Sequence, residues 1–215
     1  MILKLAIKNI FSRKSSFVII FFIAFSISVL VLTNSIFDST EHGIQETYTS
    51  SFTGDLVIPD KVKQIGYRAF YCCSFNGQLT LGNSLEKIED EALTWGPVFQ
   101  GELVIPQSVK SIEKMAFDGN GFSRIIFEEG SNLIKLGDRA FEDNLRLSDP
   151  IVLPEGLITI GTQAFYGCRN IPAVIIPSSV TTIGSYAFRN CYYITRMQCN
   201  ATTPPVVGSG AFDGI

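Results

Sequence analysis

Side chains able to perform catalysis or to bind a metal are few in this sequence of 215 residues. His42 is the only histidine, so a serine or cysteine nucleophile in the later part of the chain has no histidine base near it. Cys72 and Cys73 are adjacent and do not form the C-x-x-C pair that zinc sites use. Arg124 stands where a phosphate-binding G-x-G-x-x-G turn starting at Gly119 needs its third glycine. We therefore expect no enzyme, no cofactor and no metal.

The distribution of charge excludes one class of partner. The chain has 17 basic and 20 acidic residues, and Lys4, Lys8, Arg13 and Lys14 all precede the first acidic residue, Asp38. The remainder of the chain therefore has 13 bases against 20 acids, a net charge of −7. Nucleic-acid binding requires a clustered basic surface, so we expect no nucleic-acid partner.

An Ala-Phe pair recurs through the second part of the chain and defines the elements that position everything else. The repeat alanines are Ala69, Ala92, Ala116, Ala140, Ala164, Ala187 and Ala211, with Leu93 in place of phenylalanine in the second pair. Successive alanines are 23, 24, 24, 24, 23 and 24 residues apart, which is the period of leucine-rich repeats. Isoleucine or leucine stands four residues before the first six alanines. Units of this size bury their apolar face only when stacked, which predicts a solenoid.

Each unit contains a short alternating segment, and these segments predict a binding surface. The segments LVI, LTL, LVI, IIF, IVL, VII and MQC predict seven strands stacked in parallel at about 4.8 Å. If the first and third residues of each segment point inward, the outward row is Val57, Thr80, Val104, Ile126, Val152, Ile175 and Gln198. Its polar border is Asp55, Gln78, Glu102, Arg124 and Arg196. The apolar row is either a contact surface for a protein or glycan ligand or a reflection of β-propensity alone.

Cysteine and asparagine share the fourth position after the repeat alanine. The residues there include Cys73, Asn120, Asn144, Cys168 and Cys191. Their interchange indicates a structural ladder that faces the turn backbone. Cys168 and Cys191 belong to adjacent coils, so a disulfide between them is an alternative interpretation if the compartment is oxidising.

The repeats also carry a family resemblance. The segments IPDKVKQIGYRAFYCC, IPQSVKSIEKMAFDGN, LPEGLITIGTQAFYGC and IPSSVTTIGSYAFRNC share the unit IPxxVxxIGxxAFxxC, which resembles the BspA-like, or Treponema pallidum-type, leucine-rich repeat over residues 54–215. The resemblance implies a mainly β solenoid of about seven 23–24-residue coils and an extracytoplasmic, non-enzymatic protein-binding role, including adhesion. The last unit, TPPVVGSGAFDGI, lacks an evident polar cap, so we expect further sequence or a partner to cover that end.

The N-terminal part predicts a membrane anchor. Residues 15–37 carry no formal charge and include the run SFVIIFFIAFSISVLVL, long enough for one transmembrane α-helix. A cleaved secretory signal is the alternative, but the run is longer than a signal core and SISVLVLTNS lacks a small-x-small site. The cations predict a cytoplasmic basic stub over residues 1–14, a linker over 38–53 that includes His42, and an extracytoplasmic solenoid over 54–215, in the periplasm or at the cell surface.

A second resemblance offers another function. The stretch LAIKNIFSRKSSFVIIFFIAFSISVLVLTNSIFDST is similar to the start of FtsX-like or MacB-like transporter permeases. That resemblance implies a truncated or divergent permease subunit, with the repeats in place of the usual outer domain and an ABC transporter complex as partner. Such a permease needs further membrane helices, and the sequence predicts none after residue 37. The anchored binding module is therefore the leading interpretation.

Overall fold

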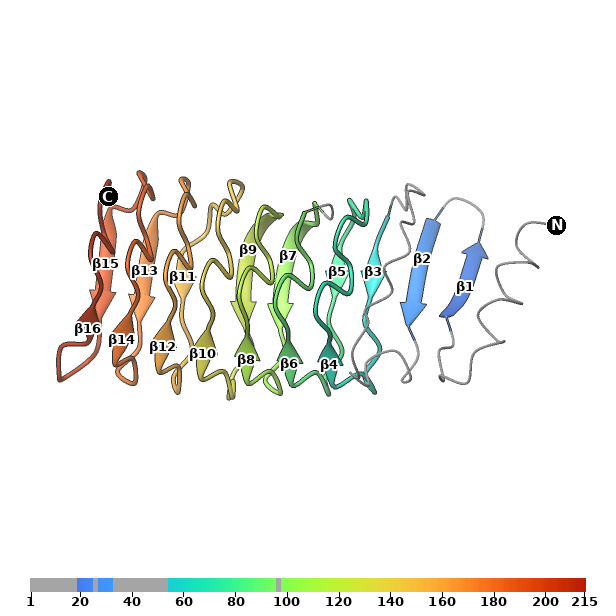
Figure 1. The fold of residues 1–215 in the computed structure, drawn as a ribbon, viewed down its shortest axis with the longest axis horizontal. Coiled ribbons are helices and arrows are strands. Elements are labelled where there is room, and N and C mark those ends of the chain that lie inside the picture. The colour runs from blue at the N-terminus through green and yellow to red at the C-terminus, as the bar shows by residue number, and fades with distance from the viewer. Residues whose placement is uncertain (1–18, 25–26, 33–53, 96–97) are drawn as a thin grey trace.

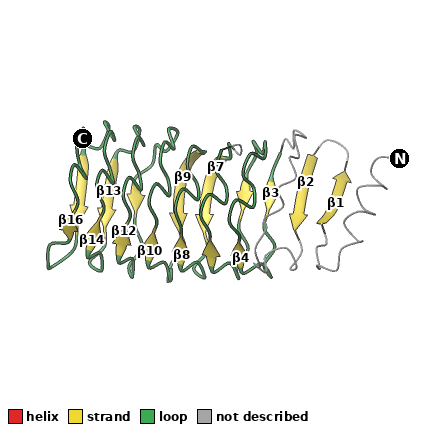
Figure 2. Ribbon diagram, in the orientation of Figure 1, coloured by secondary structure: helices red, strands yellow, loops and turns green. Residues whose placement is uncertain are grey.

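The computed structural model describes residues 19–24, 27–32, 54–95 and 98–215. Residues 54–95 and 98–215 wind as a solenoid of strands joined by turns and loops, and none of the described residues forms a helix (Figure 2). The coils follow one another along the long axis from the N-terminal to the C-terminal end (Figure 1).

One strand of each coil lies on what we call the odd-strand face. These strands are β3 (Leu56–Val57), β5 (Leu79–Thr80), β7 (Gln100–Ile105), β9 (Gly121–Phe127), β11 (Ile151–Val152), β13 (Ala173–Ile176) and β15 (Arg196–Cys199). They pair in parallel, β3 with β5, β7 with β9, β11 with β13, and β13 with β15. Equivalent residues stand opposite one another, as Val152 does to Ile175. The predicted solenoid of about seven coils with a stacked parallel sheet is confirmed.

A second sheet, which the sequence analysis did not predict, forms the even-strand face. Its strands are β4 (Gln64–Ile65), β6 (Lys87–Ile88), β8 (Ser111–Ile112), β10 (Lys135–Leu136), β12 (Thr159–Ile160), β14 (Thr182–Ile183) and β16 (Val206–Val207). All seven belong to one continuous parallel sheet. In each strand the second residue is the apolar residue four places before the repeat alanine, and from Ile65 to Ile183 it is buried.

Two left-handed residues in each coil make the turn that follows the even strand. The residue before each repeat alanine has a φ between 53° and 62°; these residues are Arg68, Glu91, Met115, Arg139, Gln163, Tyr186 and Gly210. The third residue after the alanine also has a positive φ in every coil, for example 71° at Gly119 and 63° at Asn190. Successive turns are hydrogen bonded, since the Phe141 N–H donates to the Ala164 carbonyl at 2.8 Å. This turn places the phenylalanine that follows the repeat alanine in the interior.

Stacked phenylalanine rings fill the interior behind the turns. The rings of Phe141 and Phe165, and those of Phe165 and Phe188, have centroids 5.4 Å apart and are nearly parallel. Leu93 interrupts this column, and a second stack of Phe75, Phe99 and Phe122 fills the N-terminal coils instead. The two stacks meet edge to face where Phe117 contacts Phe122, with centroids 5.9 Å apart. Aromatic stacking therefore continues through the coils despite the missing phenylalanine.

The structure differs from the sequence prediction near the N-terminus. Within the predicted helix of residues 15–37, the described residues form strands β1 (Ile19–Ala24) and β2 (Ile27–Leu32), which pair antiparallel. Strand β2 also pairs in parallel with β3, Leu30 opposite Leu56. Isoleucine, valine and phenylalanine favour strands, and β3 offers an open sheet edge to them. None of the described residues belongs to a helix long and apolar enough to cross a membrane. The predicted stub, the linker and His42 lie outside the described residues.

Candidate functional site

The predicted outward row lies on the odd-strand face. Leu56 and Ile58 are buried and Val57 between them is half-buried. Strand pairing aligns the row, with Val57 opposite Thr80 and Val104 opposite Ile126. The exposed members are Thr80, Val104, Val152 and Gln198, and the half-buried ones are Val57, Ile126 and Ile175. Val152 is the most open apolar residue of the row at 54% and Val104 follows at 39%.

The predicted polar border lies beside this row and joins neighbouring coils. A carboxylate oxygen of Asp55 accepts a hydrogen bond of 2.7 Å from the Gln78 backbone N–H. Arg124 lies 3.4 Å from Glu102 and 3.3 Å from Asp149. In β15 the Arg196 guanidinium donates to Gln198 at 2.9 Å. Exposed pairs of this kind add little stability, so they chiefly fix the polar side chains along the row.

A second exposed apolar surface, which the sequence analysis missed, lies along the even-strand face. Ile134 is 55% exposed, Ile158 is 42% exposed, and the Ile158 N–H donates to the Ile134 carbonyl at 2.9 Å. Both stand six residues before a repeat alanine. In the three preceding coils that position holds Lys63, Glu86 and Lys110, which form ion pairs of 3.2 Å and 2.6 Å. The change from charged to aliphatic residues at one repeat position was the signal available in the sequence.

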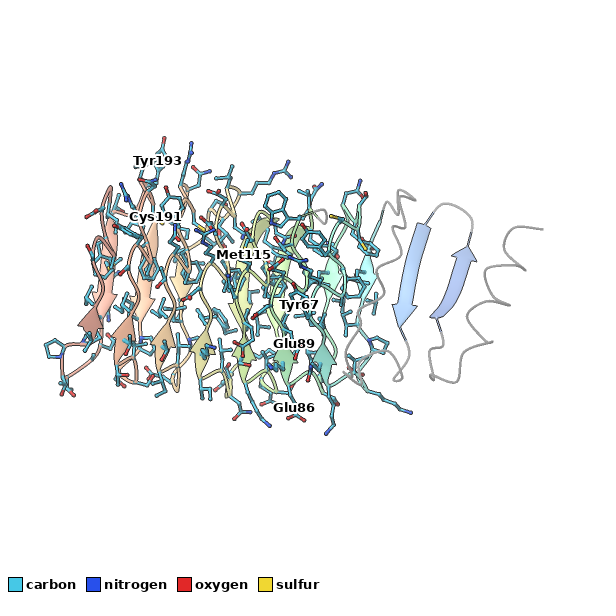
Figure 3. All side chains as sticks on the ribbon, viewed as in Figure 1. Tyr67, Glu86, Glu89, Met115, Cys191 and Tyr193 are labelled. Carbon is cyan, nitrogen blue, oxygen red and sulfur yellow. The ribbon has the colours of Figure 1, made fainter. Side chains whose placement is uncertain are left out.

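An aromatic cluster occupies the turns of the first coils. The Arg68 guanidinium lies 5.0 Å from the ring centroid of Tyr67 and 4.8 Å from that of Tyr71, and pairs with Glu91 at 2.7 Å. Tyr67, labelled in Figure 3, is 53% exposed, and Trp95 in the next coil is 65% exposed. The contacts fix the arginine between two rings, and no periodic feature of the sequence predicts them.

The ladder of asparagine and cysteine takes the structural role that the sequence predicted. Asn120 and Asn144 donate to the carbonyls of Leu93 and Phe117 in the preceding coil, at 2.9 and 2.8 Å. The thiols of Cys168 and Cys191 donate to equivalent carbonyls at 3.0 and 3.1 Å. Both thiols are free and buried. Burial raises the pKa of the Cys191 thiol to about 12 and raises the pKa of Cys168 well above its ordinary value, so neither thiol is a nucleophile at neutral pH.

An acidic group lies on the turns of the third and fourth coils. The pKa of Asp118 is raised to about 7, mainly by burial and to a smaller extent by repulsion from Glu142 and Asp143. The pKa of Glu142 is also raised, mainly by burial, while Arg139 opposes the shift from 3.4 Å away. Within the described residues no three histidine, cysteine or acidic side chains are grouped as a metal would require. The Thr94 hydroxyl donates to the Asp118 backbone carbonyl at 3.2 Å. The raised pKa of Asp118 makes the stability of the folded chain depend on pH.

Comparisons with known proteins agree with this architecture. The sequence matches the family described as the BspA type leucine rich repeat region, in six copies over residues 44–147 and 99–215. The structure is similar to the crystal structure of a leucine-rich-repeat protein of T. pallidum, with a TM-score of 0.61, 20% identity, and 94% of this chain and 88% of that chain covered. No curated protein matches the sequence. These matches lend no support to the resemblance of the N-terminal stretch to FtsX-like or MacB-like permeases.

Two other crystal structures are less similar. One is a leucine-rich cell surface protein of Faecalibacterium prausnitzii, with a TM-score of 0.29, 15% identity, and 89% of this chain and 95% of that chain covered. The other is the pneumococcal vaccine antigen PcpA, with a TM-score of 0.37, 14% identity, and 92% of this chain and 86% of that chain covered.

Proposed function

Because the chain belongs to the BspA-type leucine-rich-repeat family, we propose that it is a non-enzymatic binding module that holds a protein ligand on its odd-strand face. The observation that carries this proposal is the outward row from Val57 to Gln198. Four of its seven side chains are exposed, and the strands that hold them are fixed by the coils on either side. A rigid row of β-branched residues with polar neighbours offers contact area at a low entropic cost of binding.

Site-specific photocrosslinking tests which face is used. A photoreactive phenylalanine derivative replaces Val152 in one variant and Ile134, on the even-strand face, in a matched control. We expect illumination of producing cells to join a discrete partner to the Val152 position alone. The purified partner should then bind the Val152→Asp variant at least ten times more weakly than the Ile134→Asp variant. Crosslinking at Ile134 with none at Val152 would assign binding to the other face.

We also propose that residues 15–37 attach the solenoid to the cytoplasmic membrane, with residues 1–14 inside and the solenoid outside. The proposal rests on the uncharged run and on the four cations before it. Strands β1 and β2 occupy part of this run in the structure, so the proposal requires the run to become helical in lipid. A bilayer favours that change because a helix satisfies its own backbone hydrogen bonds.

Protease treatment of intact cells tests the proposed topology. A tag is placed after Ile215, and the tag and the mass of the membrane-bound chain are followed together. We expect the full-length chain in the membrane fraction and digestion of the tag from outside, either directly or after the outer membrane is permeabilised. Direct digestion supports a role at the cell surface, and protection until permeabilisation supports a periplasmic one. A soluble chain, or a tag protected in both states, overturns the topology.

A further inference from the structure

Arginine and tyrosine residues stand at nearly the same repeat position in three C-terminal coils, and this position lies at one edge of the solenoid. Arg146, Arg169, Tyr192 and Tyr193 stand five or six residues after their repeat alanines, and we call them the arginine–tyrosine rim. Tyr193 lies at this edge of the solenoid, above Cys191, in Figure 3. The Tyr193 N–H donates to the Arg169 carbonyl at 3.1 Å, so these two residues occupy neighbouring coils in contact. Tyr192 is 55% exposed and Tyr193 is 65% exposed.

The rim belongs to a part of the solenoid with a different charge from the rest. Residues 144–215 contain four arginines and no lysine, with only Asp149, Glu155 and Asp213 as acids. Every ion pair in the described part of the chain uses a base from Lys63 to Arg139. Neither Arg146 nor Arg169 forms one, although both are exposed. Their charges are thus available to an anionic group of a partner.

The composition of the rim favours a protein segment over a polyanion. Binding to a polyanion grows with the number of charges neutralised, and two arginines on a chain of net charge −3 give only a small gain. Tyrosine and arginine are the residues that most often supply binding energy at protein interfaces. Arginine also forms paired hydrogen bonds with a carboxylate, while a tyrosine ring offers apolar area.

We propose that the arginine–tyrosine rim binds an acidic segment of a partner protein, with carboxylates at Arg146 and Arg169 and an apolar side chain against Tyr192 and Tyr193. The rim spans three coils, about 10 Å at the spacing of stacked strands. An extended segment places the side chains of one face at alternate positions, about 7 Å apart, so five residues present three side chains to the rim. The inference rests on the proposed function only in taking the chain to be a binding module. It uses a different surface from the outward row, so the two proposals fail separately.

Fluorescence anisotropy of labelled peptides on the full chain in detergent tests the proposal. The probe is an octapeptide with glutamate at positions 2 and 4, phenylalanine at position 6 and serine elsewhere, which places all three side chains on one face of the extended chain. The control peptide has lysine in place of both glutamates. We expect only the acidic peptide to bind at low salt. The Arg146→Gln/Arg169→Gln variant should weaken binding at least tenfold, and Tyr193→Ser should weaken it several-fold. The matched control is Lys61→Gln/Lys114→Gln, which removes the same charge from exposed lysines outside the rim and should bind as the unaltered chain does.

Three outcomes would overturn the rim proposal. The first is equal binding of the acidic peptide by the arginine and lysine double variants. The second is binding of a heparin fragment without binding of the peptide, which would indicate an anionic glycan. The third is no binding of the acidic peptide by the unaltered chain. Val152→Asp should leave peptide binding unchanged, which distinguishes failure of the rim from failure of the odd-strand face. Circular dichroism of each variant checks that the coils remain folded.

Discussion

At the scale of single residues, the solenoid depends on side chains that complete hydrogen bonds between coils. Asn120 is 2% exposed, and its amide donates to the Leu93 carbonyl while its oxygen accepts from the Phe99 N–H at 3.2 Å. Asn144 makes the equivalent donation, but its buried side-chain oxygen has no hydrogen-bond partner among the described residues. An unmet buried polar group costs about 1–3 kcal/mol. The two asparagines therefore contribute unequally although they occupy the same repeat position.

Replacing each asparagine by alanine measures this inequality. We expect Asn120→Ala to lower the free energy of unfolding by about 2–4 kcal/mol, because two backbone groups lose their partners. Asn144→Ala should cost less, since it also removes an oxygen that has no partner. Urea unfolding followed by circular dichroism gives both values. Equal losses would show that the oxygen contact to Phe99 contributes nothing.

The cysteines differ in exposure and should differ in reactivity. Cys72 and Cys199 are exposed, whereas Cys168 and Cys191 are buried with raised pKa values. Only the thiolate reacts with alkylating reagents. We expect iodoacetamide at pH 8 to modify Cys72 and Cys199 within minutes and to leave the buried pair unmodified until the chain is unfolded in urea. Peptide mass mapping reads all positions, and rapid labelling of Cys168 in the folded chain would contradict the ladder.

Asp118 makes stability depend on pH near neutrality. Its pKa is about 7 in the folded chain, above its ordinary value of 3.8, so the folded state favours the protonated carboxyl. The contribution of Asp118 to the free energy of unfolding is therefore fully present below about pH 4 and is lost as the pH rises through about 7. A shift of this size corresponds to about 4 kcal/mol for a fully desolvated group. Asp118 is only partly buried, so we expect a loss of about 1–2 kcal/mol between pH 4 and pH 8.

The Asp118→Asn variant isolates this contribution because asparagine does not titrate. We expect the variant to be more stable than the unaltered chain at pH 8 and to lose less stability between pH 4 and pH 8. Urea unfolding at several pH values supplies the comparison. Glu129→Gln, at an exposed carboxylate that forms no ion pair among the described residues, is the control and should keep the original slope. An unchanged slope in Asp118→Asn would assign the pH dependence to other groups.

At the scale of elements, the closeness of successive coils depends on glycines beside the even strands. A Cβ atom added to Gly161 would lie 2.5 Å from the backbone carbon of Gly137 in the preceding coil. We expect Gly161→Ala to push the coils apart and to cost about 3 kcal/mol or more. Gly119→Ala is the matched control, because its Cβ would meet no atom within 4 Å and only its φ of +71° opposes the change, at about 1 kcal/mol. Thermal unfolding of the two variants separates the effects, and similar melting temperatures would contradict the close approach.

The odd strands can be predicted from the sequence, and the even strands cannot. The period and the alternation of segments such as Leu79–Leu81 predict the odd strands, because one side of each strand must be buried. The even strands are two residues long and contain no full alternation, so Ile160 indicates a buried position but not a second sheet. Left-handed turns at Arg139 and Gln163 escape prediction because neither residue type favours a positive φ. The strands near the N-terminus cannot be predicted from the sequence, because the same uncharged run favours two structures. It favours a helix in a lipid bilayer and strands where it lies beside a sheet.

At the scale of the whole molecule, the repeats made the odd-strand face predictable but left the other surfaces unpredicted. The outward row follows from the repeat register, so residues from Val57 to Gln198 were identified together. The arginine–tyrosine rim does not follow from it, because Arg169 and Tyr193 do not recur at one position in every coil. The only feature of the sequence that indicates the rim is the absence of acidic residues between Glu155 and Asp213. Surfaces that differ between coils distinguish one repeat protein from another, and periodicity carries no information about them.

The stability of the whole solenoid should depend on where along its axis a contact is lost. Phe165 is fully buried between Phe141 and Phe188, whereas Phe212 is half-buried and stacks on one ring, 5.9 Å from Phe188. Each coil contacts only its neighbours, so a central defect uncouples two halves and a terminal defect releases one coil. We expect Phe165→Ala to cost about 3–5 kcal/mol and Phe212→Ala a smaller amount. Hydrogen exchange should rise in the coils on both sides of Phe165 in the first variant and only after about residue 185 in the second. A uniform rise in both variants would instead show that the coils unfold as one cooperative unit.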